Sequence, residues 1–124
     1  MATPAPPPPW WDTAEVQRYN TGVNVSNLDQ RLVYFLIVAG DVHRALFRRA
    51  LLITSGNDGQ HVAGSAHYKD KAVDVRSVDL TADEQAIFSL ALGYFSRVYK
   101  VAVFDERFTA SPHWHIQTAD SVGW

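Results

Sequence analysis

Two long segments of this chain carry hydrophobic residues at helical spacing, and short runs typical of β-strands lie between and after them. The first helical segment begins near Ser26, a possible N-cap with Asp29 three residues further on. Gly40 and Asp41 are predicted to interrupt this segment, and a second hydrophobic face follows at Val42, Leu46 and Phe47. The residues expected to form the core face of the first part are Leu28, Leu32, Phe35, Leu36 and Ala39.

The second helical segment extends from about residue 81 to residue 98. Thr81 and Glu84 have the spacing of a capping box, in which each side chain accepts a hydrogen bond from the backbone N–H of the other residue. The face expected to pack in the core consists of Ile87, Leu90, Ala91, Tyr94 and Val98.

Four shorter segments have the composition of strands. A branched run at residues 50–54 precedes a Ser-Gly-Asn-Asp-Gly loop, residues 72–75 hold an acid in a hydrophobic run, and residues 99–104 and 113–117 flank a polar loop. Because these segments do not repeat as βαβ units, the pattern predicts an α+β fold, with helices packed on a small, largely antiparallel sheet. A chain of 124 residues is expected to bury one core, so residues 10–124 are predicted to form a single domain behind a proline-rich, disordered tail at residues 1–9.

Composition excludes several classes of function. A net charge of -2 provides no large positive field for a nucleic-acid partner. The absence of cysteine removes disulfides, thiolate nucleophiles and sulfur ligands, which leaves imidazole and carboxylate as the strong metal ligands. The first residues lack the basic and apolar regions of a secretory signal peptide, and the apolar stretch at residues 32–39 is too short to cross a bilayer. We therefore expect synthesis in the cytoplasm and no membrane span.

The histidines are the main chemical signal. Four of the five lie in the loop and strand regions, at His61, His67, His113 and His115, and His43 lies on the first helical segment. In a strand, His113 and His115 would share one face while Trp114 points to the other. Because imidazole is the commonest metal ligand, histidines that converge with a carboxylate predict a site for zinc or a similar ion.

Asp74 is the candidate carboxylate. It lies between Val73 and Val75, where a charged group needs a cation or hydrogen bonds to offset its loss of water. A bound metal would supply that cation.

The two regions together resemble a known family. Residues 65–74, Ser-Ala-His-Tyr-Lys-Asp-Lys-Ala-Val-Asp, are similar to the Ser-x-His-x-x-Gly-x-Ala-x-Asp signature of the zinc D-Ala-D-Ala peptidases, and His113-Trp114-His115 is similar to their closing His-x-His. That superfamily includes the Hedgehog signalling domain and many phage endolysins, and the resemblance, strongest to small phage-type members, covers about residues 50–118. Two motifs in the right order are more specific than either motif alone.

The resemblance implies a Hedgehog-like or D-Ala-D-Ala-peptidase-like fold and a metallopeptidase that hydrolyses a peptide bond in bacterial peptidoglycan. It implies that His67, Asp74 and His115 hold Zn²⁺, and that His113 and His61 lie beside the metal to stabilise the oxyanion or hold the substrate. The bond could be that of a D-Ala-D-Ala carboxypeptidase or of an L-Ala-D-Glu endopeptidase. Without a signal peptide, such an enzyme would reach the cell wall by another route, such as phage-type lysis.

The sequence departs from the family pattern at two places. Asp70 stands where the signature has Gly, which requires a left-handed backbone that Asp adopts more easily than most residues. The general base of the family is an acid shortly before the His-x-His, whereas here the nearest acids are Glu106, the preferred candidate, and Asp105. If neither reaches the metal, the domain would be a zinc-binding module that binds a peptide or a partner without cutting it.

Two further residues are candidates for the substrate site. Ser65 is expected to orient its loop by a hydrogen bond. Arg76 either binds a substrate carboxylate through a bidentate pair or forms a structural ion pair. The oligomeric state is left open, and a monomer is compatible with the sequence.

Overall fold

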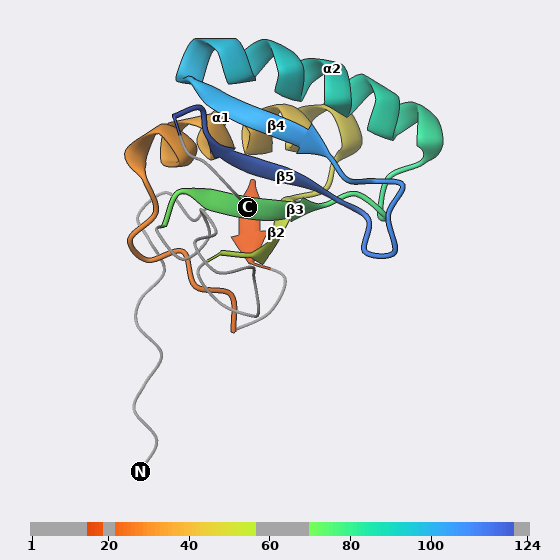
Figure 1. Ribbon diagram of the computed structural model, residues 1–124. Helices are drawn as coiled ribbons and strands as arrows, with labels where there is room; N and C mark the ends of the chain where they lie inside the picture. Colours follow the sequence, from red (N-terminus) through yellow and green to blue (C-terminus); the bar gives the residue numbers. More distant parts are fainter. Residues whose placement is uncertain (1–14, 19–21, 57–69, 121–124) are drawn as a thin grey trace.

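The chain folds into a five-stranded mixed sheet with two helices packed against it (Figure 1). The computed structural model describes residues 15–18, 22–56 and 70–120. The elements in chain order are β1 Val16–Arg18, α1 Gln30–Phe47, β2 Leu51–Ser55, β3 Ala72–Arg76, α2 Ala82–Tyr99, β4 Val101–Asp105 and β5 His113–Thr118. The predicted α+β class is confirmed, whereas β1 was not predicted.

The order of the strands across the sheet is β1-β2-β3-β5-β4. The β1–β2 pair is parallel and the other three pairs are antiparallel. The last strand, β5, therefore lies between β3 and β4, and this insertion places Asp74 directly across from His115. Two regions that are far apart in the sequence meet at this point.

The first helix is continuous, so the predicted interruption at Gly40 is wrong. Its N-cap is Asp29, whose side chain accepts a hydrogen bond from the backbone N–H of Arg31. Gly40 instead allows a close approach, because a Cβ at this position would collide with the side chain of Val16 in β1. The missing side chain therefore serves packing between α1 and β1.

The second helix has the predicted start but a different inner face. Both hydrogen bonds of the capping box between Thr81 and Glu84 are present. The buried residues are Phe88 and Leu92, and Ala91 is partly buried. The other four residues predicted for the core are exposed instead: Ile87, Leu90, Tyr94 and Val98. Within the described parts of the chain, no helix is long and apolar enough to span a membrane.

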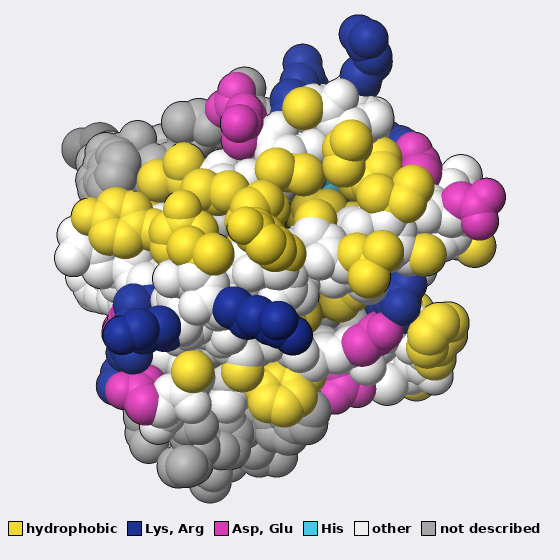
Figure 2. All heavy atoms as spheres, turned by 90° about the horizontal axis from the view of Figure 1, so that it is seen from above, with side chains coloured by type: hydrophobic (Ala, Val, Ile, Leu, Met, Phe, Trp, Pro, Cys, Tyr) yellow, Lys and Arg dark blue, Asp and Glu magenta, His cyan; other side chains and the backbone are white. Residues whose placement is uncertain are grey.

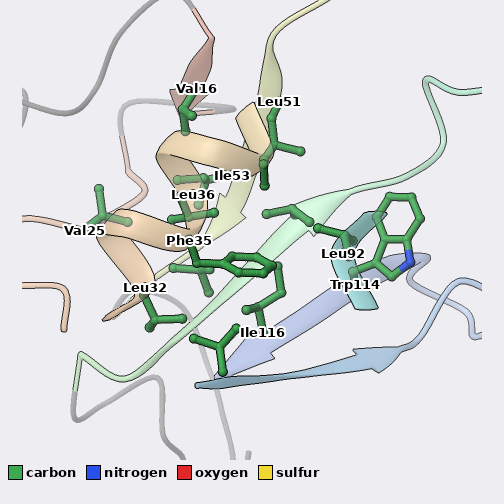
Figure 3. Close-up of a cluster of buried hydrophobic side chains, with 14 of the residues drawn as sticks. Val16, Val25, Leu32, Phe35, Leu36, Leu51, Ile53, Leu92, Trp114 and Ile116 are labelled. Carbon is green, nitrogen blue, oxygen red and sulfur yellow. The ribbon is translucent and has the colours of Figure 1, made fainter. Parts of the chain in front are cut away.

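The core lies between the helices and the inner face of the sheet (Figure 3). Phe35 and Leu36 of α1 point toward the sheet, where Ile116 belongs to the same buried cluster. Trp114 packs edge-on against Phe88 of α2, with ring centroids 5.4 Å apart. Because alternate residues of a strand face opposite sides, the neighbours of Trp114 and Ile116 point to the outer face of the sheet.

Candidate metal site

Three potential metal ligands converge on the outer face of the sheet: Asp74 of β3, and His113 and His115 of β5. One ligand atom from each side chain lies within 4.8 Å of the others. Asp74 pairs directly with His115 across the two strands, and His113 is two residues further along the same face of β5. The predicted alternation of His113, Trp114 and His115 is therefore confirmed.

The buried imidazole of His115 is held at both of its nitrogens. Nδ1 lies 3.0 Å from Oδ1 of Asp74, and Nε2 lies 2.8 Å from Oε1 of Gln117. An amide oxygen only accepts hydrogen bonds, so Nε2–H donates to Gln117. In the neutral imidazole, this contact leaves the lone pair of Nδ1 directed at the Asp74 carboxylate.

His113 is oriented in a similar way by the backbone. Its Nδ1–H donates to the carbonyl oxygen of Ser111, with 2.6 Å between the two atoms. Its Nε2 lies 3.5 Å from Oδ1 of Asp74. In the neutral form, the lone pair of this nitrogen also faces the carboxylate.

The spacing of the three ligand atoms is compatible with a metal ion between them. Two hydrogen-bond acceptors that lie 3.0 Å apart, as Asp74 Oδ1 and His115 Nδ1 do, repel each other unless a proton or a metal ion lies between them. Ligand atoms about 2.0–2.1 Å from a tetrahedral zinc lie roughly 3.3 Å from one another. Oδ1 of Asp74 lies 3.0 Å from Nδ1 of His115 and 3.5 Å from Nε2 of His113, and these two distances fall on either side of that value. Two nitrogens and one oxygen suit zinc better than calcium or magnesium, which prefer oxygen ligands.

Two neighbours of His115 were not identified from the sequence. Gln117 continues the alternation of His113 and His115, and that period of two was the signal that could have found it. Phe104 pairs with His115 across β4 and β5, and the centres of the two rings are 5.9 Å apart. The site is thus bounded by an orienting amide on its own strand and by an aromatic ring on the next.

The two candidate bases lie on opposite sides of the sheet. Asp105 pairs across the strands with Trp114, which faces the helices, and its carboxylate accepts hydrogen bonds of 2.8 Å and 2.7 Å from the Arg107 guanidinium. These hydrogen bonds hold the pKa of Asp105 below its usual value. Because cross-strand partners share one face, Asp105, the alternative candidate base, lies on the face opposite the candidate metal ligands.

Glu106 is placed differently. Its backbone N–H donates to the carbonyl of His113, and the N–H of His113 donates in return to Glu106. This reciprocal pair makes Glu106 the direct cross-strand partner of His113, so both side chains belong to the outer face. Glu106 is half-buried at the start of the loop that leads into β5.

A cleft of about 490 Å³ opens beside the candidate metal ligands. Asp74 and His113 line it together with Thr54 and Ser55 of β2 and with the loop at residues 110–112. Arg76 also lines the cleft, and its Nε donates to Oδ2 of Asp79 at 2.9 Å. Arg76 therefore forms the structural ion pair that was one of its two predicted roles.

Three predicted site residues, His61, Ser65 and His67, lie outside the described residues. The described chain resumes at Asp70, which has a φ of 58° and so adopts the left-handed backbone expected where the signature has Gly. The Asp70 carbonyl accepts a hydrogen bond of 2.8 Å from the backbone N–H of Asp29, the N-cap of α1. The described part of the signature segment is thereby attached to the first helix.

The arrangement as a whole is a possible metal-binding group at the edge of a cleft that is large enough for a small ligand. Asp74, His113 and His115 form a possible metal-binding group, and Glu106 lies on the same face. Comparisons of the chain with protein-family models, with curated proteins and with solved structures found no match.

Proposed function

We propose that this protein is a zinc-dependent peptidase that hydrolyses a peptide bond in bacterial peptidoglycan. The observation that supports it most strongly is the convergence of the Asp74 carboxylate with ring nitrogens of His113 and His115. The substrate and the reaction come from the resemblance of residues 65–74 and 113–115 to the zinc D-Ala-D-Ala peptidases.

In this proposal His67, Asp74 and His115 hold the zinc, as the resemblance implies, and His113 acts beside it. Three protein ligands leave a position open, where zinc would polarise the scissile carbonyl and lower the pKa of water. His113, whose Nε2 lies 3.5 Å from Oδ1 of Asp74, would lie beside the metal and help to stabilise the developing oxyanion. Metal content separates the two histidines: His67→Ala should lose zinc, whereas His113→Ala should retain zinc and lose activity.

Glu106 is the proposed general base. It would take a proton from the attacking water and pass it to the leaving amine. Its support is its position across from His113, which brings its side chain to the face that carries the ligands.

The matched pair Glu106→Gln and Asp105→Asn tests this assignment. Digestion of purified peptidoglycan by zinc-loaded protein, with identification of the released ends, should fall by about 10²- to 10⁴-fold for Glu106→Gln. Asp105→Asn should retain most of the activity, because its side chain lies on the other face of the sheet. Normal digestion by Glu106→Gln would contradict the role of Glu106, and no release of new ends by the wild type would contradict the peptidase.

The alternative function is a zinc-binding module that binds a peptide without cutting it. One observation favours it: the ligand cluster contains Asp74, His113 and His115 but not the Glu106 carboxylate. The module predicts that wild type and Glu106→Gln bind peptidoglycan fragments equally and that neither releases a product.

A further inference from the structure

The outer face of α2 is hydrophobic, and four of its large apolar side chains are half or more exposed in the described structure. The exposed fractions are 51% for Ile87, 78% for Leu90, 68% for Tyr94 and 57% for Val98. Figure 2 views the molecule from the side of the helices and shows hydrophobic side chains extending across this surface. Apolar residues scattered singly over a surface are ordinary, whereas a continuous stripe along one helix indicates an interaction site.

Gly93 lies on the exposed side of the same helix, on the other side of Leu90 from Ile87 and Tyr94. A glycine inside an exposed helix costs roughly 1 kcal/mol relative to alanine. A Cβ built on Gly93 would meet nothing within 4 Å, so packing within the described structure does not require the glycine. Close approach of a second helix backbone at this position would require it.

The charged residues on this face are placed so that those of one copy would complement those of a second, identical copy. Asp83 precedes Leu90 by seven residues and Arg97 follows Leu90 by seven residues, which places all three on one side of the helix. Among the described residues, neither Asp83 nor Arg97 has an ion-pair partner. If two copies of α2 pack antiparallel about a twofold axis at Leu90, Asp83 of each copy lies beside Arg97 of the other.

The same antiparallel arrangement of two copies also brings together side chains of matching size. On one side of Leu90, Ile87 lies level with Tyr94 of the second copy, so large apolar groups meet. On the other side, Ala86 lies level with Gly93 of the second copy, so the two backbones can come close. A surface on which each residue meets its own complement in an identical copy has the property that a twofold homodimer interface needs.

We propose that α2 is the interface of a homodimer, with Leu90 on the twofold axis. The helices cover one face of the sheet and Asp74, His113 and His115 occupy the other, so both metal sites remain accessible in the dimer. A single pair of helices is at the small end of specific interfaces, so the dimer should dissociate on the order of micromolar concentrations.

Sedimentation equilibrium of the full chain tests the dimer. The wild type should approach twice its monomer mass of 13.9 kDa as its concentration rises. Leu90→Glu should weaken the association at least tenfold, because each copy would bury a carboxylate against the other. Phe108→Glu is the control: Phe108 is 87% exposed but lies outside α2, so association should not change. A wild type that stays monomeric at several hundred micromolar, or a dimer that Leu90→Glu does not weaken, overturns the proposal.

Two further variants test the geometry. Asp83→Arg and Arg97→Asp should each weaken the dimer, and the double variant should restore it, which a purely apolar association would not do. Because the chain has no cysteine, Leu90→Cys should form one disulfide between two copies on mild oxidation, whereas Phe108→Cys should not. No rescue in the double variant together with no cross-link at position 90 would contradict the antiparallel arrangement. None of these measurements depends on peptidase activity.

Discussion

At the scale of single residues, the metal site depends on which nitrogen of each imidazole carries its proton. The Ser111 carbonyl and the Gln117 amide oxygen each accept an N–H from a neighbouring histidine, which directs the other nitrogen of that histidine to Asp74. Contacts of this kind fix the orientation of a ligand before a metal binds. The sequence predicted that Asp74 and His115 come together, but not these orienting contacts.

Gln117 provides the first prediction at this scale. In Gln117→Leu, Nε2–H of His115 loses its acceptor, so the preferred position of the proton and of the ring is no longer fixed. Zinc affinity, measured by competition with a chelator, should fall by about 10- to 100-fold. Gln85→Ala is the control, because Gln85 bonds the Leu80 carbonyl near the start of α2. Equal affinity of Gln117→Leu and wild type would show that this contact does not orient the ligand.

His43 provides a second prediction, which concerns stability. Its ring is only 4% exposed, lies between Phe47 and Phe88, and donates from Nδ1 to the Arg49 carbonyl at 2.7 Å. Burial lowers the pKa of His43 below its usual value of 6.5. The unfolded chain therefore binds a proton first on acidification, so the stabilisation is complete above about pH 6.5 and is lost as the pH falls toward the lower folded pKa.

The free energy of unfolding should accordingly decrease between pH 7 and pH 5, and the decrease should be smaller in His43→Gln. Chemical denaturation of both proteins in the same metal state measures this difference, because they share all the other titrating groups. Identical slopes against pH would contradict a lowered pKa for His43.

At the scale of elements, a local feature such as a helix cap was predicted correctly, whereas the face that a helix turns toward the sheet was not. The capping box of α2 depends on two residues three positions apart, and both are as predicted. The inner face was wrong because α2 carries two apolar stripes with the same period: one through Phe88 and Leu92, the other through Leu90 and Tyr94. Periodicity alone does not distinguish the stripe that meets the sheet from the stripe that faces outward.

The cap gives the prediction at this scale. Thr81→Ala removes the acceptor for the backbone N–H of Glu84 and should lower the free energy of unfolding by about 1 kcal/mol. Ser96→Ala near the other end of α2 should change it little, because the Ser96 hydroxyl only supplements a carbonyl of its own helix. The midpoints of denaturant unfolding measure both effects. A loss for Ser96→Ala as large as that for Thr81→Ala would show that the cap has no particular role.

At the scale of the whole molecule, the sheet separates a helix-covered core from a face that carries the candidate metal ligands. The sequence predicted the α+β class and the shared face of His113 and His115, because both follow from local patterns. It did not predict the insertion of β5 between β3 and β4, since strand order is determined by contacts between distant segments. It also left Glu106 and Asp105 as alternatives, because the pairing of β4 with β5 decides which side each acid faces.

The central claim is that the protein binds a metal ion, and this claim is tested on the whole molecule. A metal held by Asp74 of β3 and His115 of β5 joins two strands that are 41 residues apart at those positions. Because zinc would bind the folded form, it should stabilise that form by about 2.7 kcal/mol when its free concentration is a hundred times its dissociation constant.

Elemental analysis combined with thermal melting tests this claim most directly. Protein prepared without added zinc should contain about one zinc per chain, and a chelator should lower its melting temperature. Asp74→Ala and His115→Ala should lose both the zinc and the effect of the chelator, whereas His43→Gln, which alters a histidine outside the site, should retain both. A wild type that contains no stoichiometric transition metal, and that melts at the same temperature with and without a chelator, would contradict the metal site and the peptidase proposed from it.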